Sequence, residues 1–99
     1  LNYSSLDQYS RVTISAQFTV ATTLCRGNSP TTHRKVCVYD NNNSGEEIHQ
    51  IMTQGFWPND VKINSRETLL SIVDYEKIEF WSLEKLSKKP FKTFTLKEK

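Results

Sequence analysis

An internal repeat constrains the fold of this chain most strongly, because the second half presents the same apolar motifs in the same order as the first half. The motif at residues 12–14 (Val-x-Ile) returns at residues 61–63, and the motif at residues 36–38 (Val-x-Val) returns at residues 78–80 as Ile-x-Phe. The interval shortens from 49 residues, 12 to 61, to 42 residues, 36 to 78. This change predicts that the first unit carries a loop seven residues longer, within residues 26–35.

Two further matches complete the repeat. Residues 19–22 match residues 68–71, which aligns Ala21 with Leu70. Near the end of each half, the pair Ile48-x-x-Ile51 matches Phe91-x-x-Phe94. The two halves are therefore expected to fold into two structurally equivalent units.

Each half reads as four short β-strands, since its apolar residues alternate or form short runs instead of recurring with the helical period. A cluster of Asp, Asn and Gly at residues 40–45 predicts a turn. Residues 46–54 also fit one short helix, and residues 83–88 fit a helical turn. The candidate strands are residues 12–14, 19–24, 36–39, 48–52, 61–63, 68–73, 78–81 and 91–96.

Units of four strands that repeat at about 40 to 50 residues have the period of a propeller blade. The second strand of a blade is covered on both faces by its neighbours, and such a strand reads as continuously apolar, as residues 69–73 do. We therefore predict an all-β chain built from four-stranded antiparallel blades of a β-propeller. Residues 1–10 form a lead-in strand or linker, residues 11–54 one blade and residues 55–99 a second. A small β-sandwich or barrel is the alternative.

The second unit resembles a blade of the WD-repeat family. Residues 60–83 combine an inner strand, a Leu-Leu-Ser second strand that ends at Ser71, a tight turn at Asp74 and an aromatic strand with Trp81 in the family's Trp position. Ser82 stands where the family prefers Asp. The resemblance implies that Ser71, Asp74 and Trp81 belong to the buried hydrogen-bonded set that stabilises such blades.

The first unit resembles the preceding blade over residues 11–40, with Tyr39 and Asp40 in place of the Trp-Asp pair. The Gly-His pair of the family is absent, and Gly55-Phe56 lies near its place. The hydrogen-bonded set of the family is therefore incomplete in this chain. The resemblance indicates a divergent member, or another propeller type with the same strand order.

The resemblance implies a non-catalytic scaffold that binds a protein or peptide partner. Two blades cannot close a ring of typically about four to eight, so we expect the remaining blades in the parent protein or in another chain. The contact candidates are the aromatic residues of the connection between the units and the basic residues of the long loop, namely Phe56, Trp57, Arg26, His33 and Arg34.

The composition excludes some classes of function. The net charge of +2 does not favour nucleic-acid binding, which needs a strongly basic face. No stretch reaches the roughly 20 apolar residues of a membrane span, and no secretory signal pattern is present. Two cysteines are too few for a disulfide scaffold, and interpreting them as small, partly buried apolar residues favours an intracellular protein. Because residue 1 is Leu and not Met, we expect the chain to be a segment of a longer one.

No catalytic or metal-binding pattern is found. His33 and His49 are the only histidines, and neither forms an ordered base–nucleophile pair with a neighbour in sequence. Cys25 and Cys37 with His33 match no zinc-finger spacing and lack a fourth ligand. We expect no enzyme, no metal and no cofactor, and we interpret Asp60 and Asp74, two carboxylates near turns, as turn caps.

The two cysteines leave an alternative open. The alignment of the two units places Cys37 opposite Thr23 and Cys25 diagonal to it, which favours two free thiols. A hairpin turning symmetrically around Thr31 would instead bring the cysteines face to face. The alternative function is then a small secreted β domain with a Cys25–Cys37 disulfide, which binds a ligand or carbohydrate.

Overall fold

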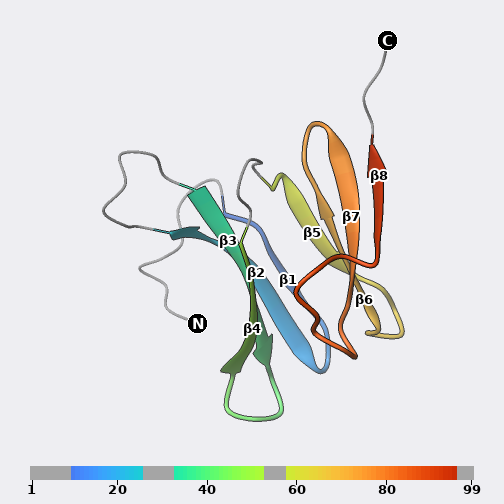
Figure 1. Ribbon diagram of the computed structural model, residues 1–99. Helices are drawn as coiled ribbons and strands as arrows, with labels where there is room; N and C mark the ends of the chain where they lie inside the picture. Colours follow the sequence, from blue (N-terminus) through green and yellow to red (C-terminus); the bar gives the residue numbers. More distant parts are fainter. Residues whose placement is uncertain (1–9, 26–32, 53–57, 96–99) are drawn as a thin grey trace.

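The computed structural model describes residues 10–25, 33–52 and 58–95. In this part of the chain, two four-stranded antiparallel sheets account for all strands, which confirms the all-β prediction (Figure 1). No helix among the described residues has the length and apolar character needed to cross a membrane. The strands are β1 (Val12–Ile14), β2 (Phe18–Cys25), β3 (His33–Asp40), β4 (Glu46–Met52), β5 (Asp60–Ile63), β6 (Leu69–Val73), β7 (Lys77–Ser82) and β8 (Lys92–Thr95).

The structure assigns both segments for which a helix or helical turn was considered. Residues 46–52 form strand β4, so the helical alternative for this segment is wrong. The segment after β7 is a turn, in which the backbone N–H of Leu86 donates to the carbonyl of Ser82 at 3.2 Å. Leu86 has a φ of 50°, a left-handed conformation that ends any helical continuation.

Each sheet is a simple meander, in the order β1-β2-β3-β4 for the first sheet and β5-β6-β7-β8 for the second. The β3–β4 turn is held by the carbonyl of Asp40, which accepts N–H groups from Asn43 and Gly45. Gly45 has a φ of 70°, in the region that glycine enters without steric cost. The predicted turn at residues 40–45 is therefore confirmed.

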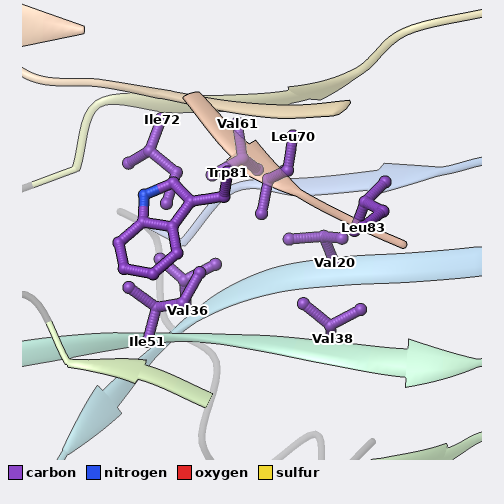
Figure 2. Packing of buried hydrophobic residues seen from close by; sticks show 9 residues of the cluster. All are labelled: Val20, Val36, Val38, Ile51, Val61, Leu70, Ile72, Trp81 and Leu83. Carbon is purple, nitrogen blue, oxygen red and sulfur yellow. The ribbon is translucent and has the colours of Figure 1, made fainter. Parts of the chain in front are cut away.

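The two sheets stack with their broad faces together, and one apolar cluster fills the space between them (Figure 2). Trp81 lies across the interface, with its ring over Val36 and Ile51 of the first sheet (Figure 2). Each aliphatic side chain buried in this way stabilises the fold by about 1.5–3 kcal/mol. The cluster contains Val20, Val36, Val38 and Ile51 from the first sheet and Val61, Leu70, Ile72, Trp81 and Leu83 from the second.

The sheets approach each other most closely at their first strands. Strand β5 comes within 8 Å, Cα to Cα, of β1 and β2, and no other pair of described strands joins the two sheets at this distance. The gap therefore widens from β1 and β5 toward β4 and β8 (Figure 1). The large indole of Trp81 fills the wider part of this wedge.

The strand register corrects the sequence alignment of the two units. Val12 pairs with Ala21 in the first sheet, whereas Val61 pairs with Ile72 in the second. Ala21 therefore corresponds to Ile72 and not to Leu70. The reason is a longer connection between β5 and β6, residues 64–68, against residues 15–17 between β1 and β2.

The same register corrects the predicted loop length. Thr22 pairs with Val36, 14 positions on, whereas Val73 pairs with Ile78, five positions on. The β2–β3 connection is therefore nine residues longer than its counterpart, and not seven. The sequence match concealed this difference, because the two extra residues of the β5–β6 connection compensate for it.

With the corrected correspondence, matched residues lie on matching faces of the two sheets. Side chains alternate between the faces of a strand, so the register assigns each residue to one face. Val36, Val38 and Ile51 face the second sheet, and their counterparts Ile78, Phe80 and Phe94 face away from the first sheet. We name this second set, together with Val73, the free face of the second sheet.

The opposite pair of faces shows the same relationship. Val61, Ile72 and Trp81 face the first sheet, and their counterparts are Val12, Ala21 and Tyr39. These counterparts lie on the side of the first sheet that points away from the second. We name the set of Val12, Ile14, Ala21, Cys37, Tyr39 and Met52 the far face of the first sheet. The two sheets therefore stack head to tail.

Burial in the second strand of each sheet differs from the prediction. The expected continuous burial is found in β2, where residues 20–23 are all buried. In β6 the burial alternates, with Leu70 and Ile72 buried and Leu69, Ser71 and Val73 half-buried. Only the face of β6 with Leu70 and Ile72 packs against the first sheet, whereas in β2 the residues of both faces are buried, Ala21 and Thr23 on the far face included.

Candidate functional site

The residues predicted to contact a partner fall mostly outside the described part of the chain. Arg26, Phe56 and Trp57 belong to the ranges 26–32 and 53–57, which are not described. The backbone of His33 and Arg34 lies in β3, paired with Cys25 and Leu24, but their side chains are not described. These five assignments stay predictions.

The free face of the second sheet is aromatic. The rings of Phe80 and Phe94 meet edge to face with their centroids 5.8 Å apart, and Phe91 lies 6.5 Å from Phe80. Phe94 is 46% exposed and Phe91 is 59% exposed. The ammonium of Lys92 lies 5.0 Å from the centroid of the Phe94 ring, a cation–π distance. An aromatic cluster with this exposure is typical of a protein contact surface.

A shallow open hollow of about 310 Å³ adjoins this aromatic cluster. The hydroxyl of Ser82 accepts the backbone N–H groups of Glu84 and Lys85 at 3.2 and 3.0 Å, which fixes the turn at its border. The walls of the hollow combine apolar and charged groups, and such a mixture is suited to the border of a protein contact. The hollow is lined by Thr68, Leu69, Ser82, Glu84, Lys85 and Phe91.

The far face of the first sheet has exposed apolar residues on its border strands and buried residues, Tyr39 included, on its middle strands. Val12 and Ile14 on β1 and Met52 on β4 are exposed. Ala21 on β2 and Cys37 on β3 are buried. In the described part of the chain, the exposed large hydrophobic residues are these three together with Phe91, Phe94 and Tyr75.

Burial controls the titration of two groups on the far face. It raises the pKa of the Cys37 thiol above its ordinary value, against the opposing effect of the Thr23 hydroxyl, which lies 3.8 Å from the sulfur. It also raises the pKa of the Tyr39 phenol, and the neighbouring Cys37 adds to this effect. Both groups therefore stay neutral at physiological pH.

The three residues assigned to a buried hydrogen-bonded set have other partners. The indole Nε1 of Trp81 donates to Oε1 of Glu79 at 3.1 Å, and both side chains are buried. Ser71 lies on the free face, opposite in direction to Trp81, and its hydroxyl donates to the carbonyl of Lys62 at 3.4 Å. Sequence reasoning missed Glu79, although its position two residues before Trp81 on one strand places both side chains on one face.

The aspartates at turns act as backbone caps. Oδ1 of Asp74 accepts the N–H groups of Glu76 and Lys77, both at 2.7 Å. Oδ1 of Asp40 accepts the N–H of Asn42 at 2.9 Å. The turn-cap interpretation of Asp74 is therefore confirmed, and Asp40 has the same role.

The backbone register separates the two cysteines. Cys25 pairs with His33, and Cys37 pairs with Ala21 and not with Thr23, as the alignment predicted. Cys25 and Cys37 are thus offset by four residues along the hairpin, about 13 Å at strand spacing. A disulfide requires Cα atoms within about 7 Å. The hairpin does not bring these cysteines together, and Cys37 is a free thiol.

Two polar contacts between the sheets were not predicted. Oε1 of Glu67, in the β5–β6 connection, accepts the hydroxyl of Ser15 at 2.5 Å and the backbone N–H of Gln17 at 2.7 Å. The bond from Ser15 lowers the pKa of Glu67, and the bond from Gln17 lowers it further. Nε2 of His49 lies 2.9 Å from the carbonyl of Ser87, near the last strands. No local sequence pattern identifies partners this far apart.

No group of three His, Cys, Asp or Glu side chains in the described ranges could hold a metal ion. No family model, no curated protein and no solved structure matches this chain.

Proposed function

We propose that this chain is a segment of a WD-repeat-like β-propeller and acts as a non-catalytic scaffold that binds a protein or peptide partner. The observation that carries the proposal is the head-to-tail stacking of two repeated four-stranded sheets, with matched residues on matching faces. In an isologous sandwich, equivalent residues of two repeated sheets would face each other. Head-to-tail contacts instead repeat by rotation, and they form a ring when that rotation closes.

The wedge between the sheets supports the same architecture. Blades of a propeller converge at their inner strands and diverge at their outer strands, because they surround a central axis. Here β5 lies close to β1 and β2, and the distance between the sheets grows toward β4 and β8. The first strand of each sheet then lies nearest the axis.

The apolar residues exposed on the two outer faces support the proposal that each face has a neighbouring blade outside this pair of sheets. A two-sheet sandwich usually exposes polar residues on its outer faces. In this chain, Val12, Ile14 and Met52 are exposed on one outer face, and Phe94 is exposed on the other, with Phe91 beside it. The remaining blades would come from the parent protein or from another chain, and their packing would cover these residues.

In this proposal the partner binds to the connections at the ends of the blades, where insertions of repeat proteins gather. The β2–β3 connection of the first sheet is the longer of the two equivalent connections, which makes it the first candidate. Arg26, Phe56 and Trp57 stay the contact residues predicted from the sequence. We propose that the protein binds this partner inside the cell.

Light scattering of the 99-residue chain, combined with thermal denaturation and binding of an apolar fluorescent dye, tests the proposal. Blades without neighbours should bind the dye and either associate or unfold over a broad temperature range. A chain that is monomeric, unfolds cooperatively and leaves the dye unbound would be a complete small domain. That result would remove the proposal.

A further inference from the structure

We infer that the outer edge of β8 binds an acidic peptide in an extended conformation, which adds to the second sheet as a fifth strand. This contact goes beyond the proposed function, which places the partner at the connections between strands. It does not depend on a closed ring, because neighbouring blades of a propeller meet face to face and leave the outer edge of each blade unpaired.

The first observation is that β8 has an open edge. Within the described part of the chain, β8 pairs with β7 alone, and no described strand lies beyond it (Figure 1). All four residues of β8 are exposed. An edge strand presents unpaired backbone N–H and C=O groups, and an extended peptide can pair with them by adding a strand to the sheet.

The other described edge strands are less suited to such pairing. Strands β1 and β5 lie where the two sheets approach each other most closely. On β4, the residues paired with β3 jump from His49 to Glu47, so Ile48 forms a bulge. Bulges protect a sheet edge because they bend the strand and interrupt the ladder. The register of β8 with β7, in contrast, runs without a shift over its four residues.

The second observation is a concentration of positive charge along this edge. Residues 85–95, which comprise β8 and most of the connection that leads to it, contain four lysines and no carboxylate. The net charge of the whole chain is only +2, so the rest of the chain carries a negative net charge. The one carboxylate of β7, Glu79, accepts the indole N–H of Trp81 and pairs with Lys77 at 3.4 Å. A peptide with carboxylates is therefore complementary in charge to this edge.

The third observation is the order of the side chains along β8. Lys92 lies opposite Phe80, and alternation along the strand places Lys92 and Phe94 on the same face. The ammonium of Lys92 lies 5.0 Å from the centroid of the Phe94 ring. Phe94 in turn meets Phe80 edge to face, which holds its ring in place. The edge thus presents a cation and an aromatic ring two residues apart.

These side chains define the peptide that would pair with β8. Residues directly opposite each other on neighbouring strands interact, and opposite charges or apolar pairs are favourable there. A carboxylate should therefore lie opposite Lys92, and an apolar residue opposite Phe94. Thr93 and Thr95 point to the other face, where β-branched residues of the peptide would pack beside them. The recognised pattern is an acidic and an apolar residue separated by one residue.

Lys92 also discriminates against other strands. Lysine on an edge strand opposes pairing with another edge, and like charges directly opposite each other destabilise a strand pair. A second copy that presented its own β8 would bring a strand of the same charge. Selection by attraction of one partner and repulsion of others is typical of specific interfaces. The same lysine would therefore admit an acidic strand and reject a basic one.

The test is the binding of two matched peptides to the 99-residue chain, measured by fluorescence anisotropy. The acidic peptide repeats Glu-Thr-Val-Thr, which places Glu and Val on one face of a strand and Thr on the other. The basic peptide carries Lys in place of every Glu. The wild type should bind the acidic peptide at least about threefold more tightly, and added salt should reduce the difference. Equal affinities for the two peptides would contradict the inference.

Lys92→Glu should reverse this preference, because Lys92 is exposed and the substitution changes mainly the charge of the edge. Lys62→Glu is the matched control, since Lys62 is also exposed but lies on the opposite edge strand of the same sheet. It should leave the preference unchanged, and a control with the same effect as Lys92→Glu would overturn the inference. Circular dichroism checks the fold of both variants, and the comparison of the two peptides on the wild type needs neither.

Methylation of the peptide nitrogens separates strand pairing from attraction of charge alone. In an extended peptide, the N–H groups of alternate residues point to opposite edges. One version of the acidic peptide is methylated at the Glu and Val nitrogens and the other at the Thr nitrogens, so each version has one blocked edge. Only one of the two versions should lose binding. Equal affinities of the two versions would show that the peptide does not add as a strand.

A single-stranded oligothymidylate of equal charge is the last probe, because aromatic and lysine side chains can also bind bases and phosphates. It should bind more weakly than the acidic peptide, and tighter binding would identify a nucleic-acid surface and overturn the inference. These results are independent of the light-scattering test. A complete monomeric domain that binds the acidic peptide would remove the proposed function and keep this inference.

Discussion

The indole Nε1 of Trp81 donates a hydrogen bond of 3.1 Å to Oε1 of Glu79, and both side chains are buried on the face that packs against the first sheet. At the equivalent positions of the first sheet, Tyr39 and Cys37 are also buried and also interact. Each unit therefore carries an aromatic residue with a partner two positions earlier on its third strand. The same two buried positions on the third strand thus recur in both units of the repeat.

Removing the partner of Trp81 should destabilise the fold. Glu79→Ala leaves a buried indole N–H without an acceptor, which costs about 1–3 kcal/mol. Glu79→Gln keeps a carbonyl oxygen and should lose less. Urea denaturation measures both variants, and a double-mutant cycle with Trp81→Phe isolates the coupling between the two side chains. A coupling energy of zero would show that the hydrogen bond does not stabilise the protein.

Trp81 itself should contribute more than its hydrogen bond. Trp81→Ala empties the wide part of the wedge between the sheets and should lower the free energy of unfolding by about 3–5 kcal/mol. Tyr75→Ala, at an exposed turn, should change it by less than about 0.5 kcal/mol. Chemical denaturation of the two variants compares them directly. Equal effects of the two substitutions would contradict the stacked arrangement.

The contact of Glu67 should make stability depend on pH. The bonds from Ser15 and Gln17 hold the pKa of Glu67 below its ordinary value of 4.5, so the folded state favours the ionised form. The stabilisation is present above pH 4.5 and is lost as the pH falls through the lower pKa of the folded state. Carbon-detected NMR titration of the Glu67 carboxyl group measures that pKa.

Glu67→Gln provides the matched variant. Its stability relative to the wild type should be lower at pH 7, and the difference should shrink in acid, where Glu67 of the wild type is protonated. Ser15→Ala should move the pKa of Glu67 back toward its ordinary value. A difference that stays constant from pH 7 to acid would show that the carboxylate does not stabilise the contact.

Both cysteines should carry free thiols, and the two thiols should differ in their rate of reaction. The register predicts two thiols per unfolded chain without reduction, and burial should make Cys37 slow to react in the folded chain. Because the pKa of Cys37 is raised, its contribution to stability is present below the ordinary value of 9.0 and is lost as the pH rises through the higher folded value. A colorimetric thiol assay with and without denaturant counts the groups. Fewer than two thiols in denaturant would contradict the register.

The sequence predicted much of the fold because the signal was local. Period-two alternation and turn residues located the strands, and the Asp-Asn-rich cluster located the β3–β4 turn at Gly45. The register was mispredicted, since Asn64 stabilises a longer β5–β6 connection by accepting the N–H groups of Thr68 and Leu69. An alignment made by counting residues does not include this side-chain contact. It therefore matches Ala21 with Leu70, whereas the strand register matches Ala21 with Ile72.

The candidate surfaces were harder to predict from the sequence. The repeat suggested that the blade faces are apolar, but only the stacking shows which face of each sheet is covered. In the sequence, Phe94 and Val12 are both apolar residues of predicted strands. Their exposure on opposite outer faces depends on contacts between distant strands. The contact between Glu67 and Ser15 likewise joins residues far apart in sequence.

The head-to-tail stacking of the two sheets is the central claim, and nuclear Overhauser contacts of the Trp81 ring test it most directly. With the methyl groups of valine and isoleucine labelled, cross-peaks should connect the Trp81 ring protons to Val36 and Ile51 of the first sheet, over which the ring lies (Figure 2). If the ring shows cross-peaks only to residues of its own sheet, such as Ile72, the two sheets do not stack through these faces and the account is contradicted.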